Sequence, residues 1–170
     1  YNYTMIYLVS DHTGFEVKGK VQQFLKKEGY EVEDLGAFKM DPTDDYPDFI
    51  SKAASKVSND SQSVGIIFGG SGQGEAMVAN KYRNVRCALF YDPATPVRAV
   101  DITGRQSSDP FEILKLTREH NHANLLSIGI RFLKDEDILK AIKIWLETPF
   151  SKEERHVRRV EKIKKIEETL

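Results

Sequence analysis

The chain has 170 residues, of which 40% are hydrophobic and 30% charged, and its formal net charge at pH 7 is -1. These proportions are typical of one globular domain with a buried core. The small net charge argues against nucleic acid or an anionic membrane as the main partner, and no apolar run approaches the length of a membrane span. We see no basic-plus-apolar leader, and the lone Cys87 excludes an intramolecular disulfide, so we expect a cytoplasmic protein.

Apolar runs and amphipathic segments alternate along the chain. Strands are expected at residues 5–9, 30–35, 64–68, 85–90 and 125–129. Apolar residues at helical spacing lie between them, over residues 17–25, 47–57, 76–81, 110–120 and 138–146, and Gly29 is expected to close the first of these helices. Strands that are nearly continuous in apolar residues and alternate with helices predict an α/β fold with a parallel sheet covered on both faces, in a single domain.

A glycine-rich turn follows the third strand. Residues 69–74 hold four glycines, a serine and a glutamine, and Glu75 stands at the head of the next helix. Backbone N–H groups and the helix dipole at such a turn form an anion cradle. The spacing is not that of a dinucleotide fingerprint, and a P-loop needs a lysine in place of Glu75. A carboxylate here suits a base that takes a proton from carbon while amides hold the oxyanion. The alternative is a plain turn in which Glu75 complements the helix dipole.

Further polar side chains follow the other strands. The candidates are Asp11 and His12 after the first strand, Tyr46 in the loop after the second, Arg131 after the fifth, and His120 with Asn121 at the end of the helix before the fifth. Because ligands bind beyond the carboxyl ends of parallel strands, we expect these residues to belong to one site. The alternatives to a functional role are that His12 is only a hydrogen-bonded loop residue and that His120 only complements the dipole at a helix C-terminus.

An acidic cluster lies in the loop before residue 47. Asp41, Asp44, Asp45 and Asp48 resemble a metal site, but their flexible spacing around two prolines favours turn and cap roles, so no metal is expected. Cys87, within an apolar strand, is interpreted as a small core residue and not as a nucleophile.

Several motifs, in this order, resemble the type B ribose-5-phosphate isomerases and the related galactose-6-phosphate isomerase subunits. They are residues 10–15, 45–47, 69–75 with 79–81, 119–124, 128–131 and 155–160. The resemblance implies a Rossmann-like domain, a homodimer or dimer of dimers, and no cofactor. It also implies aldose–ketose isomerisation of a phosphorylated sugar, with ribose 5-phosphate and ribulose 5-phosphate as the default substrates.

The resemblance also implies roles for individual residues. One branch of the family places a catalytic cysteine at the position of Gly69, and the other uses a glutamate at the position of Glu75. This sequence follows the second pattern, so Glu75 is the expected base. By the same resemblance, Ser71 and the amides around Gly70, Gly72 and Gly74 would hold substrate oxygens, and Asn121 would bind the enediolate oxygen. His120 would open the sugar ring, with Asp11 and Tyr46 near the sugar hydroxyls. The phosphate would be held by His12, Arg131, Arg155 and Arg159, some of them from a neighbouring subunit.

Two segments carry further expectations. Residues 94–110 form an insertion relative to the family, which we expect to close over the ligand as a lid, with a surface elaboration or dimer contact as the alternative. The terminal helix, residues 152–170, carries an apolar stripe that predicts a dimer contact, although a solvated face is the usual meaning of its charges. A six-carbon phosphosugar and a non-catalytic phosphate-binding protein remain alternative functions.

Overall fold

The computed structural model describes residues 3–169 and contains a five-stranded sheet in the order β2-β1-β3-β5-β4. The strands are β1 Ile6–Ser10, β2 Val32–Asp34, β3 Val64–Gly69, β4 Cys87–Phe90 and β5 Leu125–Gly129, and every pairing is parallel. The helices are α1 Phe15–Lys27, α2 Tyr46–Asn59, α3 Gln73–Ala79, α4 Glu112–Glu119, α5 Asp135–Glu147 and α6 Glu154–Glu168, with a short 3₁₀ helix, η1 Ile130–Phe132. The predicted Rossmann-like parallel sheet is confirmed.

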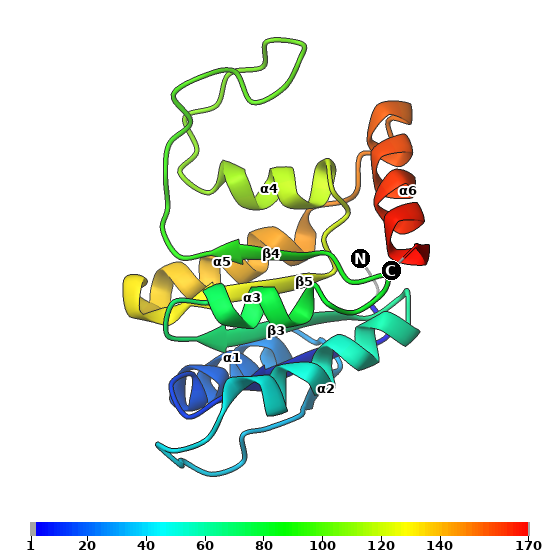
Figure 1. Ribbon diagram of the computed structural model, residues 1–170. Helices are drawn as coiled ribbons and strands as arrows, with labels where there is room; N and C mark the ends of the chain where they lie inside the picture. Colours follow the sequence, from blue (N-terminus) through cyan, green and yellow to red (C-terminus); the bar gives the residue numbers. More distant parts are fainter. Residues whose placement is uncertain (1–2, 170) are drawn as a thin grey trace.

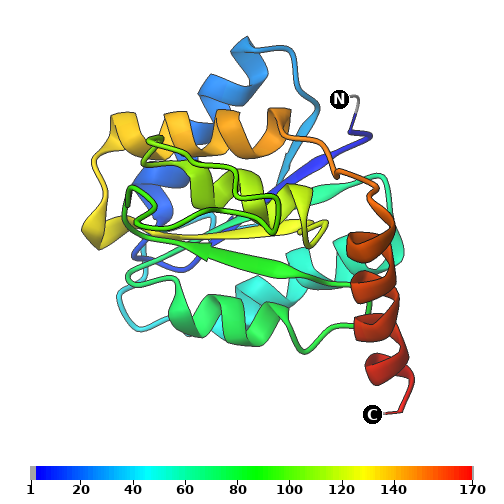
Figure 2. The same cartoon turned by 90° about the horizontal axis from the view of Figure 1, so that it is seen from above.

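Helices cover both faces of the sheet, as Figure 2 shows from above. Residues of α1, α4 and α5 pack on one face, and residues of α2 and α3 pack on the other. Right-handed crossovers explain this division, because the direction in which the chain steps along the sheet decides which face its helix covers. The chain steps one way from β1 to β2 and from β4 to β5, and the other way from β2 to β3 and from β3 to β4.

Successive residues of the central strand point into the two different cores. Ile66 and Phe68 pack with Trp145 on the face of α1, α4 and α5, while Ile67 packs with Ile50 on the face of α2 and α3. This is the period-two alternation of a strand, and because both faces are buried it appears in the sequence as a continuous apolar run.

Element boundaries differ slightly from those expected. Gly29 has φ 87° and follows α1, as its predicted closing role requires. The second strand is shorter than the predicted 30–35, and Tyr46 is the first residue of α2 and not a loop residue. Helix α6 lies within the predicted 152–170, of which residue 170 is outside the described part of the chain.

Residues 94–110 adopt no helix or strand. A hydrogen bond from the Ala94 amide to the Pro110 carbonyl, 2.9 Å long, closes the base of this segment. In Figure 1 the segment leaves the end of β4 and arches over α4, and in Figure 2 it runs along α4. Within the described residues, no helix has the length and apolarity that crossing a membrane would require.

Lys18 is a buried cation that the sequence analysis did not identify. The residue is 1% exposed, and its ammonium donates to the Asp34 carboxylate and to the Ala37 carbonyl oxygen at 2.8 Å. Burial lowers the pKa of Lys18, with the Asp34 hydrogen bond opposing that effect. The contact ties α1 to the end of β2.

We expect Lys18→Ala to lower the free energy of unfolding by about 3 kcal/mol, because it leaves a cavity and an unpaired acceptor. Urea denaturation measures this loss. Lys26→Ala, at an exposed position of the same helix, is the control and should change stability by less than about 0.5 kcal/mol. Equal effects of the two substitutions would show that the Lys18 contact contributes nothing.

Candidate active site

The carboxylate of Glu75 lies directly over Gly69. Glu75 is in the first turn of α3 and is only 5% exposed. A Cβ atom added to Gly69 would lie 1.8 Å from Glu75 Oε1 and 2.0 Å from its Cδ, so the carboxylate occupies the space that a side chain at position 69 would need. The helix thus turns the acid back onto the end of β3 and not outward toward solvent, where an acid that only complements a helix dipole would lie.

Burial raises the pKa of Glu75, and the nearby charge of Asp11 raises it further. Its own backbone amide and the guanidinium of Arg131 oppose these effects. A carboxylate with a raised pKa is a better proton acceptor than one in water, which is the property that a base for carbon acids needs.

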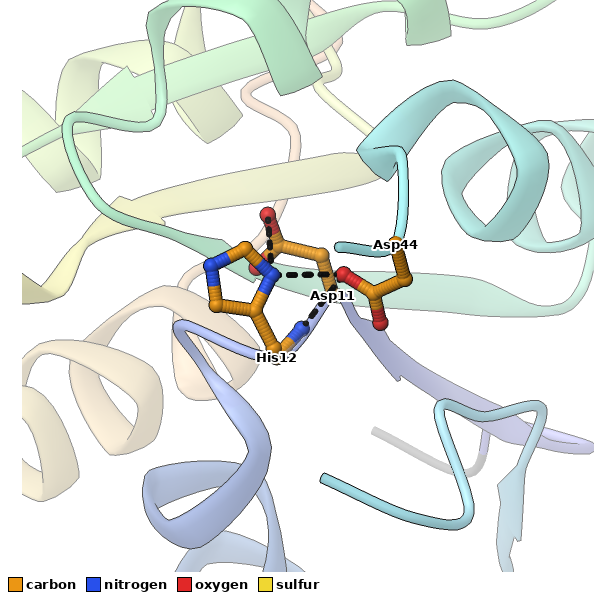
Figure 3. Close-up of side chains that lie close together, drawn as sticks. All are labelled: Asp11, His12 and Asp44. Atoms are coloured by element: carbon orange, nitrogen blue, oxygen red, sulfur yellow. Dashed lines mark hydrogen bonds and ion pairs between the residues drawn. The ribbon is translucent and has the colours of Figure 1, made fainter. Parts of the chain in front are cut away.

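His12 is held by two carboxylates, as Figure 3 shows. Its Nδ1 lies 2.6 Å from Asp44 Oδ1 and 3.9 Å from Asp11 Oδ2, and its backbone amide also donates to Asp44. The hydrogen bond with Asp44 is the largest cause of a raised pKa for His12. Asp11, 6% exposed, follows β1 and accepts from the Thr13 amide at 2.9 Å. The pair therefore favours a protonated imidazole, which can bind an anion.

The ligand atoms of Asp11, His12 and Asp44 lie within 4.8 Å of one another, a spacing that a cation could also use. The short contact from His12 Nδ1 to Asp44 has the geometry of a hydrogen bond in which the ring donates, and this bond accounts for the arrangement without an ion.

The glycines of the turn allow close approach by other elements. The Tyr46 hydroxyl would lie 2.6 Å from a Cβ on Gly74, and the Arg131 guanidinium 3.1 Å from a Cβ on Gly70. Gly72 has φ 74°, and its carbonyl accepts a hydrogen bond from Ser127 Oγ at 2.7 Å. Ser71 is exposed, and its hydroxyl accepts from the Gln73 amide. The structure thus brings the following predicted residues to one edge of the sheet: Asp11, His12, Tyr46, Gly70, Ser71, Gly72, Gly74, Glu75 and Arg131.

The remaining predicted residues lie elsewhere in the chain. His120 ends α4, and the Asn124 carbonyl that follows accepts from the Gly65 amide at the start of β3. Glu75 lies over Gly69, four residues further along that strand, which corresponds to about 13 Å. His120 and Asn121 are therefore at the opposite edge of the sheet from Glu75, and the prediction that one chain brings them together is wrong.

Arg155 belongs to this second group. His120, Arg155 and residues of 101–105 line a depression of about 400 Å³. The ring of His120 packs on His156 with centroids 4.2 Å apart, and His156 is fixed by the Ser151 hydroxyl at 2.7 Å. Arg159 is exposed on the same helix, α6, which Figure 1 shows beside the edge of the sheet where the strands begin.

Cys87 has the structural role expected for it, and the buried ring of His122 also has a packing role. Burial raises the pKa of Cys87 to about 12, so its thiol is unreactive near neutral pH, and it packs with the core under α2 and α3. Burial also lowers the pKa of His122 to about 4, and its ring stacks on Phe150 with centroids 4.7 Å apart.

Asp44 is a site residue that the sequence analysis missed. It was interpreted as a turn or cap residue, and for Asp44 that interpretation was wrong because its carboxylate binds His12. The partners are 32 residues apart in the chain, so no local pattern could have revealed the pair. Asp41 does have the expected turn role, since it accepts from the Thr43 amide at 3.1 Å.

We expect Asp44→Asn to lower the pKa of His12, because the charged acceptor is lost. The folded pKa of His12 is raised, so the protonated ring is fully present at low pH and is lost as pH rises through that pKa. In the variant the His12 ring should lose its proton at lower pH than in the parent. KM for a phosphosugar should therefore begin to rise at lower pH as well. NMR titration of the histidines, with Asp45→Asn as the control, measures the shift. An unchanged His12 titration would contradict the assigned contact.

Comparisons with known proteins identify the family of the chain. The family model described as Ribose/Galactose Isomerase matches residues 6–106 and 102–163. The ribose-5-phosphate isomerase B of Mycolicibacterium paratuberculosis is 38% identical over 164 residues, which are 96% of this chain and 92% of that protein.

Solved structures give the same result. Ribose-5-phosphate isomerase B from Mycoplasma genitalium, solved with bound ribulose-5-phosphate, superposes with a TM-score of 0.84 at 33% identity, covering 98% of this chain and 97% of that one. Type B ribose 5-phosphate isomerase from Trypanosoma cruzi has a TM-score of 0.82 at 32% identity, covering 98% and 99%. The family model matches most of this chain, and the alignment with the Mycolicibacterium paratuberculosis protein covers nearly all of both proteins. The chain therefore belongs to the ribose/galactose isomerase family.

Proposed function

We propose that the chain is an aldose–ketose isomerase that interconverts ribose 5-phosphate and ribulose 5-phosphate through an enediolate. One observation carries this proposal: a buried carboxylate of raised pKa, Glu75, lies over the last residue of the central strand, at the head of a glycine-rich turn. One relative is named ribose-5-phosphate isomerase B, and the solved Mycoplasma genitalium relative holds bound ribulose-5-phosphate, which supports this sugar pair as the substrate and product.

The reaction moves protons and needs no electron acceptor. Glu75 would take the proton from C2 of the open-chain aldose and return it to C1, while the proton on O2 passes to O1. One carboxylate can reach both carbons by a small rotation. Ser71 and the amides of the turn would hold the oxygens on which negative charge develops, and one such donor is typically worth about 10²–10³ in rate.

Phosphate binding would use the cations beside the turn. Arg131 packs on Gly70, and the hydrogen bond with Asp44 raises the pKa of His12, which favours its protonated form. A guanidinium can bind phosphate through two parallel hydrogen bonds, which fixes the sugar as well as binding it. The carboxylate of Asp11 lies 3.9 Å from the His12 ring at the same edge and would accept a hydrogen bond from a sugar hydroxyl.

The site of one chain lacks the ring-opening acid. His120 and Asn121 lie at the far edge of the sheet, so in the proposed reaction they come from a partner subunit, together with Arg155 and Arg159.

Two features support a homodimer or dimer of dimers. Strand β4 is an outermost strand of the sheet. Beside it lies a hollow of about 420 Å³ lined by Cys87, Asn121, Ile163 and Ile166 among others. Ile163 and Ile166 are 38% and 60% exposed, so the apolar stripe of α6 is only partly covered by its own chain.

A coupled assay with five- and six-carbon aldose phosphates tests the reaction. We expect turnover of ribose 5-phosphate to exceed that of the six-carbon substrates. A preference for a six-carbon sugar would replace the substrate but keep the reaction. Tight phosphosugar binding without turnover of any of them would identify a binding protein instead. The cytoplasmic location stays a prediction.

Mixed dimers test the shared site. We expect a Glu75→Gln subunit and an Arg159→Ala subunit to regain activity when combined, because one of the two sites then carries both lesions and the other is intact. Dual-tag purification followed by the coupled assay measures this. Activity no higher than that of either parent would count against sharing.

A further inference from the structure

Residues 101–105, here called the tip of the 94–110 segment, lie beside the proposed ring-opening residue. Asp101, Thr103 and Arg105 line the same depression of about 400 Å³ as His120 and Arg155. The sequence predicts that the segment closes over the ligand, with a surface elaboration or dimer contact as the alternative. The segment does begin at the end of β4 next to the proposed sugar pocket of its own chain, but its tip reaches the other end of α4.

Arg105 holds the tip in this place. Its guanidinium lies 3.1 Å from Asp101, 2.9 Å from Glu112 and 3.0 Å from Glu119. Glu112 and Glu119 are two turns apart on one face of α4, so a single side chain fastens the tip along the whole helix. Glu112 is 2% exposed, so in one of these pairs the carboxylate is buried although the guanidinium is 39% exposed.

The tip is also ordered internally. The Thr103 hydroxyl donates to Asp101 at 2.6 Å, the Thr103 amide donates to the same oxygen at 2.8 Å, and the Val100 amide donates to the Arg105 carbonyl at 2.8 Å. Thr103 itself is exposed. The last turn of α4, which carries His120, is fixed from the other side by the Ser151 amide, which donates to the Glu119 carbonyl at 3.2 Å. A preformed wall of polar groups therefore stands next to His120.

We propose that the tip forms a wall of the substrate pocket of the neighbouring subunit and helps to determine which phosphosugar fits there. This inference rests on the proposed function. A substrate that receives a proton from His120 must enter the depression that the tip lines. Because Glu75 of the same chain is at the opposite edge of the sheet, that substrate is bound to the Glu75 of the partner subunit. Arg105 is a positioning residue in this arrangement, and Thr103 lines the pocket.

Specificity is the expected readout. Five- and six-carbon sugar phosphates differ by one CHOH unit, and a contact with one such group typically changes kcat/KM by about 10–200-fold. We expect Arg105→Gln to change the ratio of kcat/KM for five-carbon over six-carbon aldose phosphates by at least about fivefold. The change should be mainly in KM, since Glu75 is not touched. Arg98→Gln, an exposed arginine of the same segment with no ion pair among the described residues, should leave the ratio within about twofold.

Thr103→Ala keeps the test decisive if Arg105→Gln does not fold, because Thr103 is exposed and its amide and hydroxyl donate to Asp101 within the tip. It should change the ratio in the same direction. Ratios equal to the parent in both variants, or in Thr103→Ala alone where Arg105→Gln is unfolded, would overturn the proposal.

Two mixed dimers decide which subunit the tip serves. In the first, a parent chain is combined with a chain carrying Glu75→Gln and Arg105→Gln, so that the working Glu75 faces the altered tip of its partner. We expect the altered ratio. In the second, a Glu75→Gln chain is combined with an Arg105→Gln chain, so that the working Glu75 faces an intact tip. We expect the parent ratio.

The opposite pattern in the two mixed dimers would place the tip at the site of its own chain, and a monomeric protein in sedimentation would likewise overturn the proposal. A parent protein without isomerase activity on any aldose phosphate would be a failure of the proposed function instead. In that case a protection assay decides the inference: a bound phosphosugar should protect Arg105 from arginine-specific modification, and unchanged modification would overturn it.

Discussion

Turnover of ribose 5-phosphate is expected to fall by about 10²–10⁴-fold in Glu75→Gln, while phosphosugar binding survives. The amide has the size of the carboxylate but cannot accept the proton from C2. Steady-state kinetics should show the loss in kcat, and isothermal titration should show that the sugar still binds. The matched control is Glu16→Gln, because Glu16 is also an acid in the first turn of a helix but is exposed.

The same substitution should stabilise the fold near neutral pH. Burial raises the pKa of Glu75 above its unfolded value, so the folded state binds the proton more tightly. The free energy of unfolding therefore falls as pH rises from the pKa of Glu75 in the unfolded chain through its higher pKa in the folded protein. Below both pKa values the carboxyl group is protonated in both states, and this destabilisation is absent. Glu75→Gln should gain in free energy of unfolding at pH 7 but not at pH 3. Retained turnover would contradict the role of Glu75 as base, whereas an unchanged stability would contradict its burial.

The second large effect is expected for Gly69→Ala. The added methyl carbon would lie 1.8 Å from Glu75 Oε1, a distance that no pair of nonbonded atoms can adopt, so the carboxylate has to rotate away from the substrate. Displacement of a catalytic group by about 1 Å can cost on the order of 10²-fold in rate. We expect a loss of that size in kcat, with the fold intact because residue 69 is not in a left-handed conformation.

Gly19→Ala is the control for this substitution. Gly19 lies within α1, and nothing lies within 4 Å of the added carbon, so the change should leave turnover unaltered and raise helix stability slightly. A Gly69→Ala variant with more than about half of the parent turnover would show that Glu75 does not work from the position found in the structure.

Local patterns were sufficient to predict the elements of the sheet. The strands β1, β3 and β5 are mostly apolar and are fully buried, and Gly29 marks the end of α1 by its positive φ. The strand order was not predictable in the same way. Nothing in the sequence of β5 shows that it lies between β3 and β4, because pairing depends on contacts between residues far apart in the chain.

The two missed contacts differ in how far the sequence could have shown them. Lys18 lies on the same helical stripe as Val21 and Leu25, which are both fully buried, so its position on the helix did indicate burial although its charge suggested otherwise. Asp44 offered no such signal. The candidate site was predicted best where strand ends supply residues directly, and worst for His120 and Asn121, which precede a strand and therefore start from the other edge.

The overlap of Glu75 with the side-chain space of position 69 also has a consequence for how the family could diverge. A cysteine at position 69 and a glutamate at position 75 cannot occupy their working positions together, because their atoms would coincide. Acquiring the cysteine first would displace the existing base, and losing the glutamate first would leave none. The two positions are therefore coupled by strong epistasis, and a lineage passing between the two forms would cross a fitness valley unless a second gene copy supplied the activity meanwhile.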